Sequence, residues 1–260
     1  MSWSAEQYVA FEAERTRPAR DLLSSIPAEE VGVAIDIGCG PGNSTGLLAA
    51  RFPTARITGI DSSPDMIAAA RERLPGIRFE IADVGAWSQA GRASPGADLI
   101  FANAVLQWVP GHAGLFPALV ARLSTGGWLA VQVPDNLDEP AQRLMREIAA
   151  DGPWREKLAG ADRSRVRIEP VHWYYGLLRA SCARVEVWRT TYYHALEGAD
   201  AVVEWFKGTG LLPFLAPLDA VERADYLDRY TRAIERAYPE SADGTVLLPF
   251  PRLFIVAKHR

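Results

Sequence analysis

The sequence predicts an α/β protein built on an open, mostly parallel, doubly wound sheet with an antiparallel closing strand and a helical lid insertion. Three observations predict this fold class. Short apolar runs alternate with amphipathic segments through about residue 134, which is the pattern of a parallel sheet with crossover helices. A glycine-rich turn follows the first apolar run directly. Two amphipathic helices then separate the last two predicted strands and cannot extend the sheet.

Two short helices are expected before the first strand. A capping box (SAEQ) at Ser4 begins the first of them, which runs through the segment YVAFEAER. Thr16 is expected to cap the second. The apolar side chains of this second helix should face the core: Leu22, Leu23 and Ile26.

Residues 31–134 are predicted to form the cofactor-binding core. Its first strand, residues 31–37 (VGVAIDI), is continuously apolar, as expected for a strand buried on both faces. Ser63 before Pro64 is a strong helix start signal. The other core strands are expected at residues 55–61, 77–83, 97–105 and 126–135, with helices at 44–52, 62–74 and 114–123.

The remaining chain is expected to belong to the same single domain, residues 1–260. Residues 183–196 alternate like a strand, and residues 246–259 form the closing strand. The helices at 198–240 are expected to form a lid over the carboxyl ends of the strands, where ligands bind in such sheets. Residues 151–167 receive no role.

Composition narrows the possible functions. The formal net charge is −4, which argues against a nucleic-acid-binding protein because phosphate neutralisation needs a basic face. No stretch approaches the ~20 apolar residues that a membrane span needs, and the polar start resembles no signal peptide. We therefore expect a cytoplasmic protein. The oligomeric state stays open.

The chain has 28 basic residues, of which only Lys157, Lys207 and Lys258 are lysines. A GC-rich genome explains such a bias, and so does a need for planar, bidentate capture of carboxylates by arginine. The two cysteines form no disulfide framework, and the four histidines are too scattered for a metal site. Among them, His112 and His259 are expected on the surface, and Cys39 is expected to fill the glycine turn.

The segment AIDIGCGPGNSTG predicts a close approach between backbone and ligand. Gly38 and Gly40 follow the first strand, where only residues without a Cβ let the backbone come near. The dinucleotide fingerprint needs a glycine where this chain has Asn43. Asp36 would repel a pyrophosphate but would attract a ligand that carries an ammonium and a sulfonium group. S-adenosylmethionine carries both.

Acidic residues end the next two strands as well. Asp61 is placed to accept both ribose hydroxyls, and Asp83 to accept from the adenine amino group. Met66 can lie against the adenine face. The alternative is that Asp61 and Asp83 are turn or capping acids. An N-terminal flap over residues 1–30, which contains Trp3 and Tyr8, is expected to fold over the cofactor. The complete set of predicted cofactor-binding residues is Asp36, Gly38, Gly40, Asn43, Asp61, Ser62, Met66, Asp83, Val84, Asn103 and Tyr8.

Several segments resemble known methyltransferases. The chain is similar to class I S-adenosylmethionine-dependent methyltransferases in DIGCGPGNSTGLL, ITGIDSSPDMIAAAR and ADLIFANAVLQWV, and to the trans-aconitate 2-methyltransferase family in AERTRPARDLL, IFANAVLQW, VWRTTYYHAL and FPRLFIVA. The resemblance implies a Rossmann-like methyltransferase fold and the transfer of a methyl group to a carboxylate of trans-aconitate. The products would be a monomethyl ester and S-adenosylhomocysteine.

A carboxylate nucleophile is already ionised at pH 7, so this chemistry requires no general base. Gln107, Trp108 and His194 are instead expected to position the reactants. The small-molecule polycarboxylate would need cationic or hydrogen-bonding partners in a dry site. The candidates for that role are Arg17, Arg189, Tyr192, Tyr193 and Arg252.

Two other readings stay open at this point. A methyltransferase for a quinone, phenol or natural product would have a neutral, apolar pocket. A non-catalytic S-adenosylmethionine-binding protein would bind the cofactor without transferring the methyl group. A dinucleotide oxidoreductase is disfavoured by Asn43.

Overall fold

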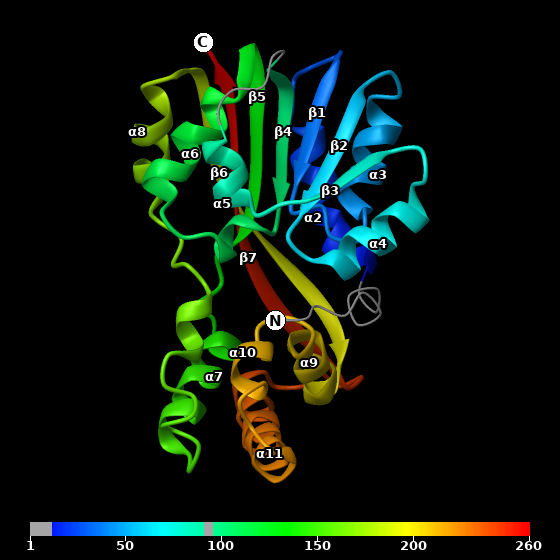
Figure 1. Cartoon of the computed structure of the whole chain (residues 1–260). Helices are drawn as coiled ribbons and strands as arrows, with labels where there is room; N and C mark the ends of the chain where they lie inside the picture. Colours follow the sequence, from blue (N-terminus) through cyan, green and yellow to red (C-terminus); the bar gives the residue numbers. More distant parts are fainter. Residues whose placement is uncertain (1–11, 91–95) are drawn as a thin grey trace. The chain divides into compact units, whose positions relative to one another are not determined.

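The computed structural model describes residues 12–90 and 96–260, and it contains a seven-stranded sheet in the order β3-β2-β1-β4-β5-β7-β6 (Figure 1). The pairs β1–β2, β1–β4, β2–β3 and β4–β5 are parallel, and one closing strand is antiparallel. The predicted fold class is confirmed. The strands are β1 (Val33–Ile37), β2 (Arg56–Asp61), β3 (Arg78–Ile81), β4 (Ala97–Asn103), β5 (Leu123–Pro134), β6 (Cys182–Glu197) and β7 (Thr245–His259).

Helices of very different length connect these strands. The α-helices are α2 (Glu12–Ser24), α3 (Asn43–Arg51), α4 (Pro64–Arg73), α5 (Val84–Gln89), α6 (His112–Ala121), α7 (Pro140–Asp151), α8 (Val171–Arg179), α9 (Gly198–Lys207), α10 (Leu212–Leu215) and α11 (Ala220–Ala237). Two short 3₁₀ helices are η1 (Leu106–Trp108) and η2 (Ala161–Ser164). The sequence did not predict α5, α7 or α8.

The described chain divides into two compact units. We call residues 135–167 and 191–252 the helical unit. The sheet unit comprises the described residues up to 134 together with 168–190 and 253–260. The expected lid, residues 198–240, lies within the helical unit. Whether it covers a ligand stays a prediction.

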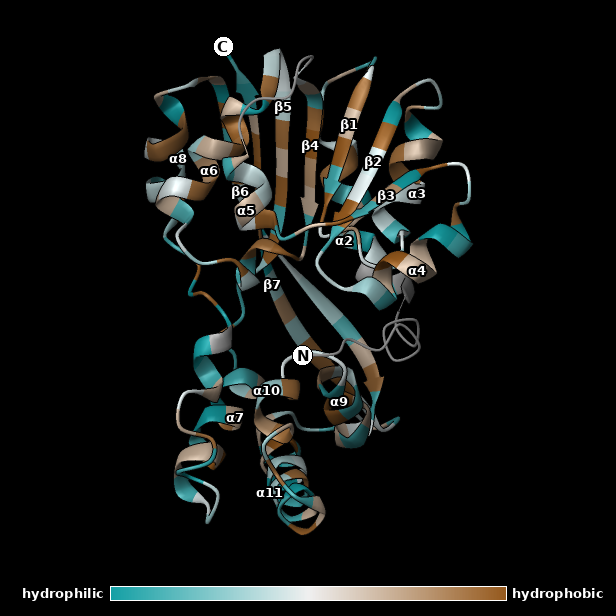
Figure 2. Ribbon diagram, in the orientation of Figure 1, coloured by the Kyte–Doolittle hydropathy of each residue, from teal (hydrophilic) through white to brown (hydrophobic). Residues whose placement is uncertain are grey.

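The core of the sheet unit is formed by the central strands, which are strongly apolar (Figure 2). In β4, the side chains from Leu99 to Ala102 are all buried, because helices cover both faces of a parallel sheet. The strand order reverses beside β1, whose neighbours are β2 and β4. This topological switch point is where open α/β sheets bind ligands, and the glycine turn begins there.

The helix α2 differs from the expectation of two short helices. It runs without a break from Glu12 to Ser24, with Pro18 inside it, so Thr16 does not cap a second helix. Thr16, Ala19 and Leu23 are buried on one face, and α2 packs against α3. This burial outweighs the backbone hydrogen bond that Pro18 cannot donate. The expected capping box at Ser4 lies outside the described residues.

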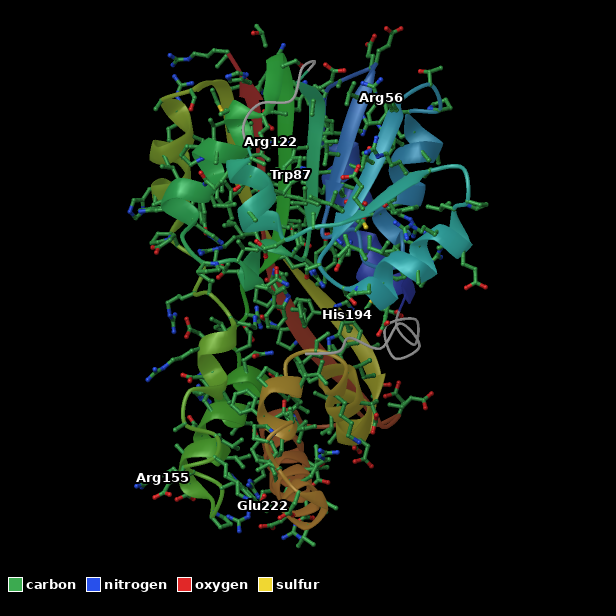
Figure 3. The ribbon with its side chains drawn as sticks, viewed as in Figure 1. Arg56, Trp87, Arg122, Arg155, His194 and Glu222 are labelled. Atoms are coloured by element: carbon green, nitrogen blue, oxygen red, sulfur yellow. The ribbon has the colours of Figure 1, made fainter. Side chains whose placement is uncertain are left out.

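Two local interactions illustrate how the other helices are fixed. Ser63 caps α4 by accepting a hydrogen bond from the Met66 backbone, with Pro64 at the first helical position, as predicted. In the sheet unit, the guanidinium of Arg122 lies 3.8 Å from the centre of the Trp87 ring (Figure 3). This cation–π contact joins α5 to the end of α6.

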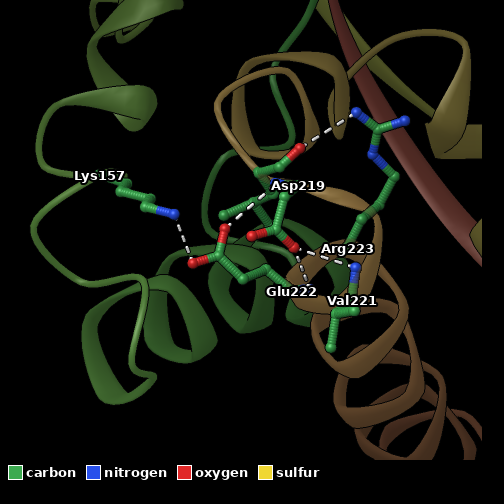
Figure 4. A network of polar contacts seen from close by, with 6 residues as sticks. Lys157, Asp219, Val221, Glu222 and Arg223 are labelled. Atoms are coloured by element: carbon green, nitrogen blue, oxygen red, sulfur yellow. Dashed lines mark hydrogen bonds and ion pairs between the residues drawn. The ribbon is translucent and has the colours of Figure 1, made fainter.

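The helical unit is organised around α11, which packs against α7 and α9. Asp219 and Glu222 form a capping box at its start, and Lys157 donates a hydrogen bond of 2.6 Å to Glu222 (Figure 4). The buried hydroxyls of Tyr226 and Tyr230 donate to backbone carbonyls of α7. These bonds connect segments that are far apart in the sequence.

Candidate functional site

The glycine turn after β1 has three residues with positive φ: Gly38 at 68°, Gly40 at 54° and Gly42 at 91°. A Cβ on Gly38 would lie 2.3 Å from the Val105 side chain, so this glycine is required by packing. Within residues 12–90 and 96–260, a Cβ on Gly40 would have no protein atom within 4 Å. The space above Gly40 is therefore open to a ligand.

Asp61 connects the end of β2 to this turn. One carboxylate oxygen accepts a hydrogen bond of 3.0 Å from the Gly40 backbone, and the other accepts one of 2.9 Å from the Ser63 backbone. Part of the capping alternative is thus present, because Asp61 does order two turns. Each oxygen keeps further lone-pair capacity, so a role toward ribose hydroxyls stays a prediction.

Asp36 lies two residues before the glycine turn and is fully buried. Its Oδ2 accepts hydrogen bonds from the hydroxyls of Ser44 (2.7 Å) and Thr45 (2.6 Å). Its Oδ1 has no hydrogen-bond partner among the described residues. Burial raises the pKa of Asp36 to about 7, the charge of Asp61 adds to the rise, and the two hydroxyls oppose it. A cation beside Oδ1 would stabilise the ionised form.

A small pocket lies at the same edge of the sheet. Its lining residues are Thr16, Ala19, Gly38, Cys39, Pro41, Asn43, Ser44 and Asn103. Within the described chain, three of these residues have a buried polar atom without a hydrogen-bond partner: Thr16 Oγ1, Asn43 Nδ2 and Asn103 Oδ1. Together with Asp36 Oδ1, they offer acceptors for an ammonium group and a donor for a carboxylate. The amino-acid end of S-adenosylmethionine carries both groups, so these residues fit it.

The remaining predicted cofactor residues have mixed environments. Met66 and Val84 are buried, whereas Ser62 is exposed. Asp83 caps α5 by accepting a hydrogen bond of 2.8 Å from the Ala86 backbone, which is the alternative that the sequence left open. Its contact with adenine stays a prediction. Tyr8 and Trp3 lie outside the described residues.

The turn after β4 holds two of the predicted positioning residues. Ala104 has a left-handed φ of 55°, an uncommon conformation for a residue with a side chain. Gln107 is buried and donates a hydrogen bond of 2.6 Å from Nε2 to the Ala104 carbonyl. Its Oε1 has no partner among the described residues, so it presents an acceptor. Trp108 is half-buried.

Two histidines correct the expectation from the sequence. His112 is only 4% exposed, because Tyr174 of α8 covers it, although the sequence suggested a surface position. His259 is half-buried, with Nδ1 3.1 Å from the Ser124 carbonyl oxygen. Cys39 is buried in the turn, as expected for a small filler, and burial raises the pKa of its thiol.

The helical unit brings three of the predicted residues together, namely Tyr192, His194 and Arg252, all buried. The Arg252 guanidinium lies 4.7 Å from the centre of the Phe250 ring and 5.9 Å from that of Tyr192. The His194 ring, labelled in Figure 3, lies 4.4 Å from the Trp205 ring. We call Tyr192, His194 and Arg252, with the aromatic rings around them, the arginine cluster.

Other substrate candidates do not join this cluster. Tyr193 points the other way along β6 and is 64% exposed, as the alternation of a strand requires. Arg17 and Arg189 are exposed and belong to the sheet unit.

Sequence reasoning missed several site residues. Ser44 and Thr45 hold Asp36, and the signal for them was their place at the start of α3, directly after the glycine turn. Arg165, from the stretch without an assigned role, donates to Asn136 in the helical unit. Burial and the charge of Arg146 lower the pKa of Arg165 to about 10.

Comparisons with known proteins place the chain in a family. A model of a methyltransferase domain matches residues 35–129. A trans-aconitate 2-methyltransferase of Methylobacterium nodulans is 55% identical over 257 residues, which cover 99% of this chain and 98% of the relative. The chain belongs to the trans-aconitate 2-methyltransferase family. The family member of Variovorax paradoxus is 51% identical over 260 residues, covering 100% of this chain and 99% of the relative. The resemblance noted in the sequence is confirmed.

Solved structures support the fold of this trans-aconitate 2-methyltransferase family member. The YcgJ protein of Bacillus subtilis has a TM-score of 0.62 at 11% identity, covering 94% of this chain and 98% of its own. Phosphoethanolamine N-methyltransferase 2 of Haemonchus contortus, in complex with S-adenosylhomocysteine, has a TM-score of 0.56 at 15% identity, covering 94% and 53%. At such identities the likeness concerns the fold alone.

None of the helices in residues 12–90 and 96–260 is long and apolar enough to cross a membrane. The same part of the chain contains no group of three or more His, Cys, Asp or Glu side chains arranged to hold a metal ion.

Proposed function

We propose that this protein transfers the methyl group of S-adenosylmethionine to a carboxylate of trans-aconitate, forming a monomethyl ester and S-adenosylhomocysteine. The observation that carries the proposal is identity above 50% over nearly the full chain to relatives named for this reaction. The polar atoms around the glycine turn support it, because they fit the amino-acid end of the cofactor.

The sheet unit supplies the cofactor site. Asp36 Oδ1 and Asn103 Oδ1 would accept from the ammonium group, and Asn43 Nδ2 would donate to the carboxylate. Asp61 would bind the ribose, and the open space above Gly40 would admit the nucleoside. When bound, S-adenosylmethionine supplies an electrophilic methyl group on a positively charged sulfur. The partial negative charge on Gln107 Oε1 would complement the positive charge of the sulfur.

Methyl transfer to a carboxylate is a reaction that depends on positioning. A carboxyl group with a pKa near 4 is ionised at neutral pH, so no side chain must remove a proton. Gln107 and Trp108 are proposed to align the reactants and to exclude water. Such proximity and orientation are worth roughly 7–11 kcal/mol in favourable cases.

The remaining carboxylates of a tricarboxylate substrate need compensation once water is removed. We assign this to the arginine cluster, in which a buried guanidinium and the Tyr192 hydroxyl are presented among aromatic rings. Arg17, Arg189 and Tyr193 remain candidates from the sequence, and residues 198–240 remain the proposed lid. Arg165 is an additional candidate from the helical unit.

The decisive experiment is an activity panel. Purified protein is incubated with S-adenosylmethionine and with trans-aconitate, cis-aconitate, citrate or a set of phenols, and methyl esters and ethers are quantified. Trans-aconitate should give the highest kcat/KM. Methylation of phenols alone would contradict the proposal and favour the natural-product alternative. Calorimetry with S-adenosylhomocysteine and with NAD tests the cofactor independently, and only the first should bind.

A further inference from the structure

The turn that carries Gln107 and Trp108 is connected to α8 by a chain of hydrogen bonds. The Nε2 atom of His112 lies 2.9 Å from the Leu106 carbonyl oxygen, and its Nδ1 lies 2.7 Å from the Tyr174 hydroxyl. The Glu169 backbone N–H donates to the same hydroxyl at 3.4 Å. All of these residues belong to the sheet unit.

One arrangement of protons satisfies these three hydrogen bonds, and the backbone of Val109 makes a further hydrogen bond with His112. The Leu106 carbonyl can only accept, so His112 Nε2 must carry a hydrogen. Burial lowers the pKa of His112, which keeps the ring neutral and leaves Nδ1 as an acceptor. Tyr174 must then donate its hydroxyl hydrogen to Nδ1 and accept from the Glu169 backbone. The Leu106 carbonyl therefore sets the tautomer of the histidine, and the tyrosine hydroxyl holds the ring by Nδ1 so that Nε2–H points at that carbonyl.

The hydrogen bonds that start at Tyr174 end at the carbonyl of Leu106, the first residue of η1. The Leu106 carbonyl also accepts a hydrogen bond of 3.0 Å from the Val109 backbone, so both of its lone pairs are used. The side chains of His112 and Tyr174 are enclosed by aromatic rings. The centre of the Phe116 ring lies 5.3 Å from that of His112, and the centre of the Trp173 ring lies 5.0 Å from that of Tyr174. In such a dry environment each bond is stronger and each missing bond is costly.

We propose that Tyr174, acting through His112, is a positioning residue that holds the η1 turn and with it Gln107 and Trp108 in the geometry for methyl transfer. This inference rests on the proposed function. The turn already contains a left-handed alanine and a buried glutamine, so its conformation depends on contacts from outside. A displacement of about 1 Å in such a turn can lower a rate by roughly 100-fold.

The test compares two substitutions on the same helix. Tyr174→Phe removes the hydroxyl and keeps the buried ring. Tyr175→Phe is the matched control, because Tyr175 is 48% exposed and takes no part in the chain. In ligand-free protein, amide hydrogen exchange at Trp108 and Val109 should accelerate at least tenfold in Tyr174→Phe. It should stay unchanged in the control. Amides of β1 and β4 should exchange at the wild-type rate, which separates a local effect from general destabilisation.

Two further measurements complete the test. Imidazole ¹H–¹⁵N spectra should show the Nε2–H tautomer of His112 in all three proteins. In Tyr174→Phe alone, the Nδ1 resonance should shift because its hydroxyl donor is lost, and the Nε2 proton should exchange faster with solvent because the ring is no longer held. The kcat for trans-aconitate should fall at least fivefold in Tyr174→Phe, while the Kd for S-adenosylhomocysteine stays within twofold. Wild-type exchange of the amides and of the imidazole proton, or a wild-type kcat, would each overturn the proposal. A wild-type enzyme inactive toward trans-aconitate would contradict the proposed function, and the exchange rates would still decide the role of Tyr174.

Discussion

At the scale of single residues, Asp36 has the most unusual environment in the cofactor site. Burial raises the pKa of its carboxyl group to about 7, so the ligand-free protein is partly protonated there at neutral pH. Binding an ammonium group favours the ionised form. Affinity for S-adenosylhomocysteine should therefore increase as the pH rises toward and past this pKa.

We expect the Kd for S-adenosylhomocysteine to fall roughly five- to tenfold between pH 6 and pH 7.5, as proton linkage to one such group requires. Isothermal titration calorimetry measures the Kd over this pH range. The range lies below the pKa of about 7.7–8.0 of an α-amino group in peptides, so the ammonium group of the ligand stays charged. Asp36→Asn should bind weakly and with little pH dependence. A variant that keeps the wild-type pH profile would remove Asp36 from this role.

The same group makes a prediction about stability. A carboxyl group whose folded-state pKa is raised contributes stability below its unfolded value of 3.8, and this contribution is lost as the pH rises through about 7. Ligand-free Asp36→Asn should therefore gain stability over the wild type at pH 8, and the gain should be smaller at pH 5, where only part of the contribution is lost. Urea unfolding at both pH values tests the sign, and a difference larger at pH 5 than at pH 8 would contradict it.

Asp61 should contribute to cofactor binding directly. We expect Asp61→Ala to weaken S-adenosylhomocysteine by about 1.5–3 kcal/mol, the usual range for hydrogen bonds to a charged group. Asp61→Asn, which keeps one acceptor oxygen, should lose less. Asp65→Ala is the control, since this acid is exposed on α4. Unchanged affinity in Asp61→Ala would leave Asp61 as a turn-ordering residue only.

Arg252 tests the substrate side. Arg252→Gln should raise the KM for trans-aconitate by a factor corresponding to about 1.5–3 kcal/mol, because a charge-assisted hydrogen bond to the substrate is lost. Its Kd for S-adenosylhomocysteine should stay at the wild-type value. Arg232→Gln serves as control, since Arg232 pairs with Asp228 on the exposed side of α11. An unchanged KM would exclude the arginine cluster.

At the scale of elements, a substitution in the glycine turn can separate the requirement for folding from the requirement for ligand binding. Gly40→Ala should cost only about 1–2 kcal/mol of folding free energy for the left-handed conformation, because a Cβ there meets no atom of the described residues. Its loss of S-adenosylhomocysteine affinity should be larger, since the Cβ enters the ligand space. Gly76→Ala, at an open position without positive φ, should change neither property. Thermal unfolding and calorimetry distinguish the two effects.

Elements with local signals were predicted well from the sequence. The start of α4 followed from Ser63 and Pro64, and β1 followed from one apolar run. The predictions for Thr16 and His112 were wrong because contacts with residues distant in the sequence determine their environment. Thr16 has the chemistry of a cap, but burial of one face of α2 keeps the helix continuous. His112 was expected on the surface, and contact with Tyr174 of α8, an element that was not predicted, makes it a buried residue.

At the scale of the whole molecule, the sequence predicted the sheet and left part of the helical unit unassigned. Each parallel strand carries its own apolar pattern, whereas α7 is stabilised by tyrosine hydroxyls that come from α11. The helical spacing of Ala141, Met145 and Ala149 after Pro140 is nevertheless a local signal for α7, and sequence reasoning missed it. Sequence reasoning located the polar residues that end consecutive strands beside the glycine turn, but it missed the hydroxyls of Ser44 and Thr45 that hold Asp36.

The two units give the proposed lid a direct test. S-adenosylhomocysteine alone should slow amide exchange in the sheet unit, around the glycine turn and η1. Adding trans-aconitate should then slow exchange around Tyr192 and Arg252 in the helical unit. Exchange mass spectrometry with cofactor product, acid or both resolves the two steps. No protection of the helical unit by the acid would contradict both the lid and the substrate role of the arginine cluster.

Between Glu12 and Arg260 the described chain passes between the two units four times, so neither unit is a continuous piece of polypeptide. The buried segment from Leu253 to Ala257 belongs to the sheet unit, although the whole helical unit is encoded before it. During synthesis on the ribosome, the sheet unit therefore cannot be completed until β7 has been made, long after the strands beside it. A nascent chain arrested within α11 would expose an unfinished sheet edge, and it is at this stage that a chaperone would be needed most.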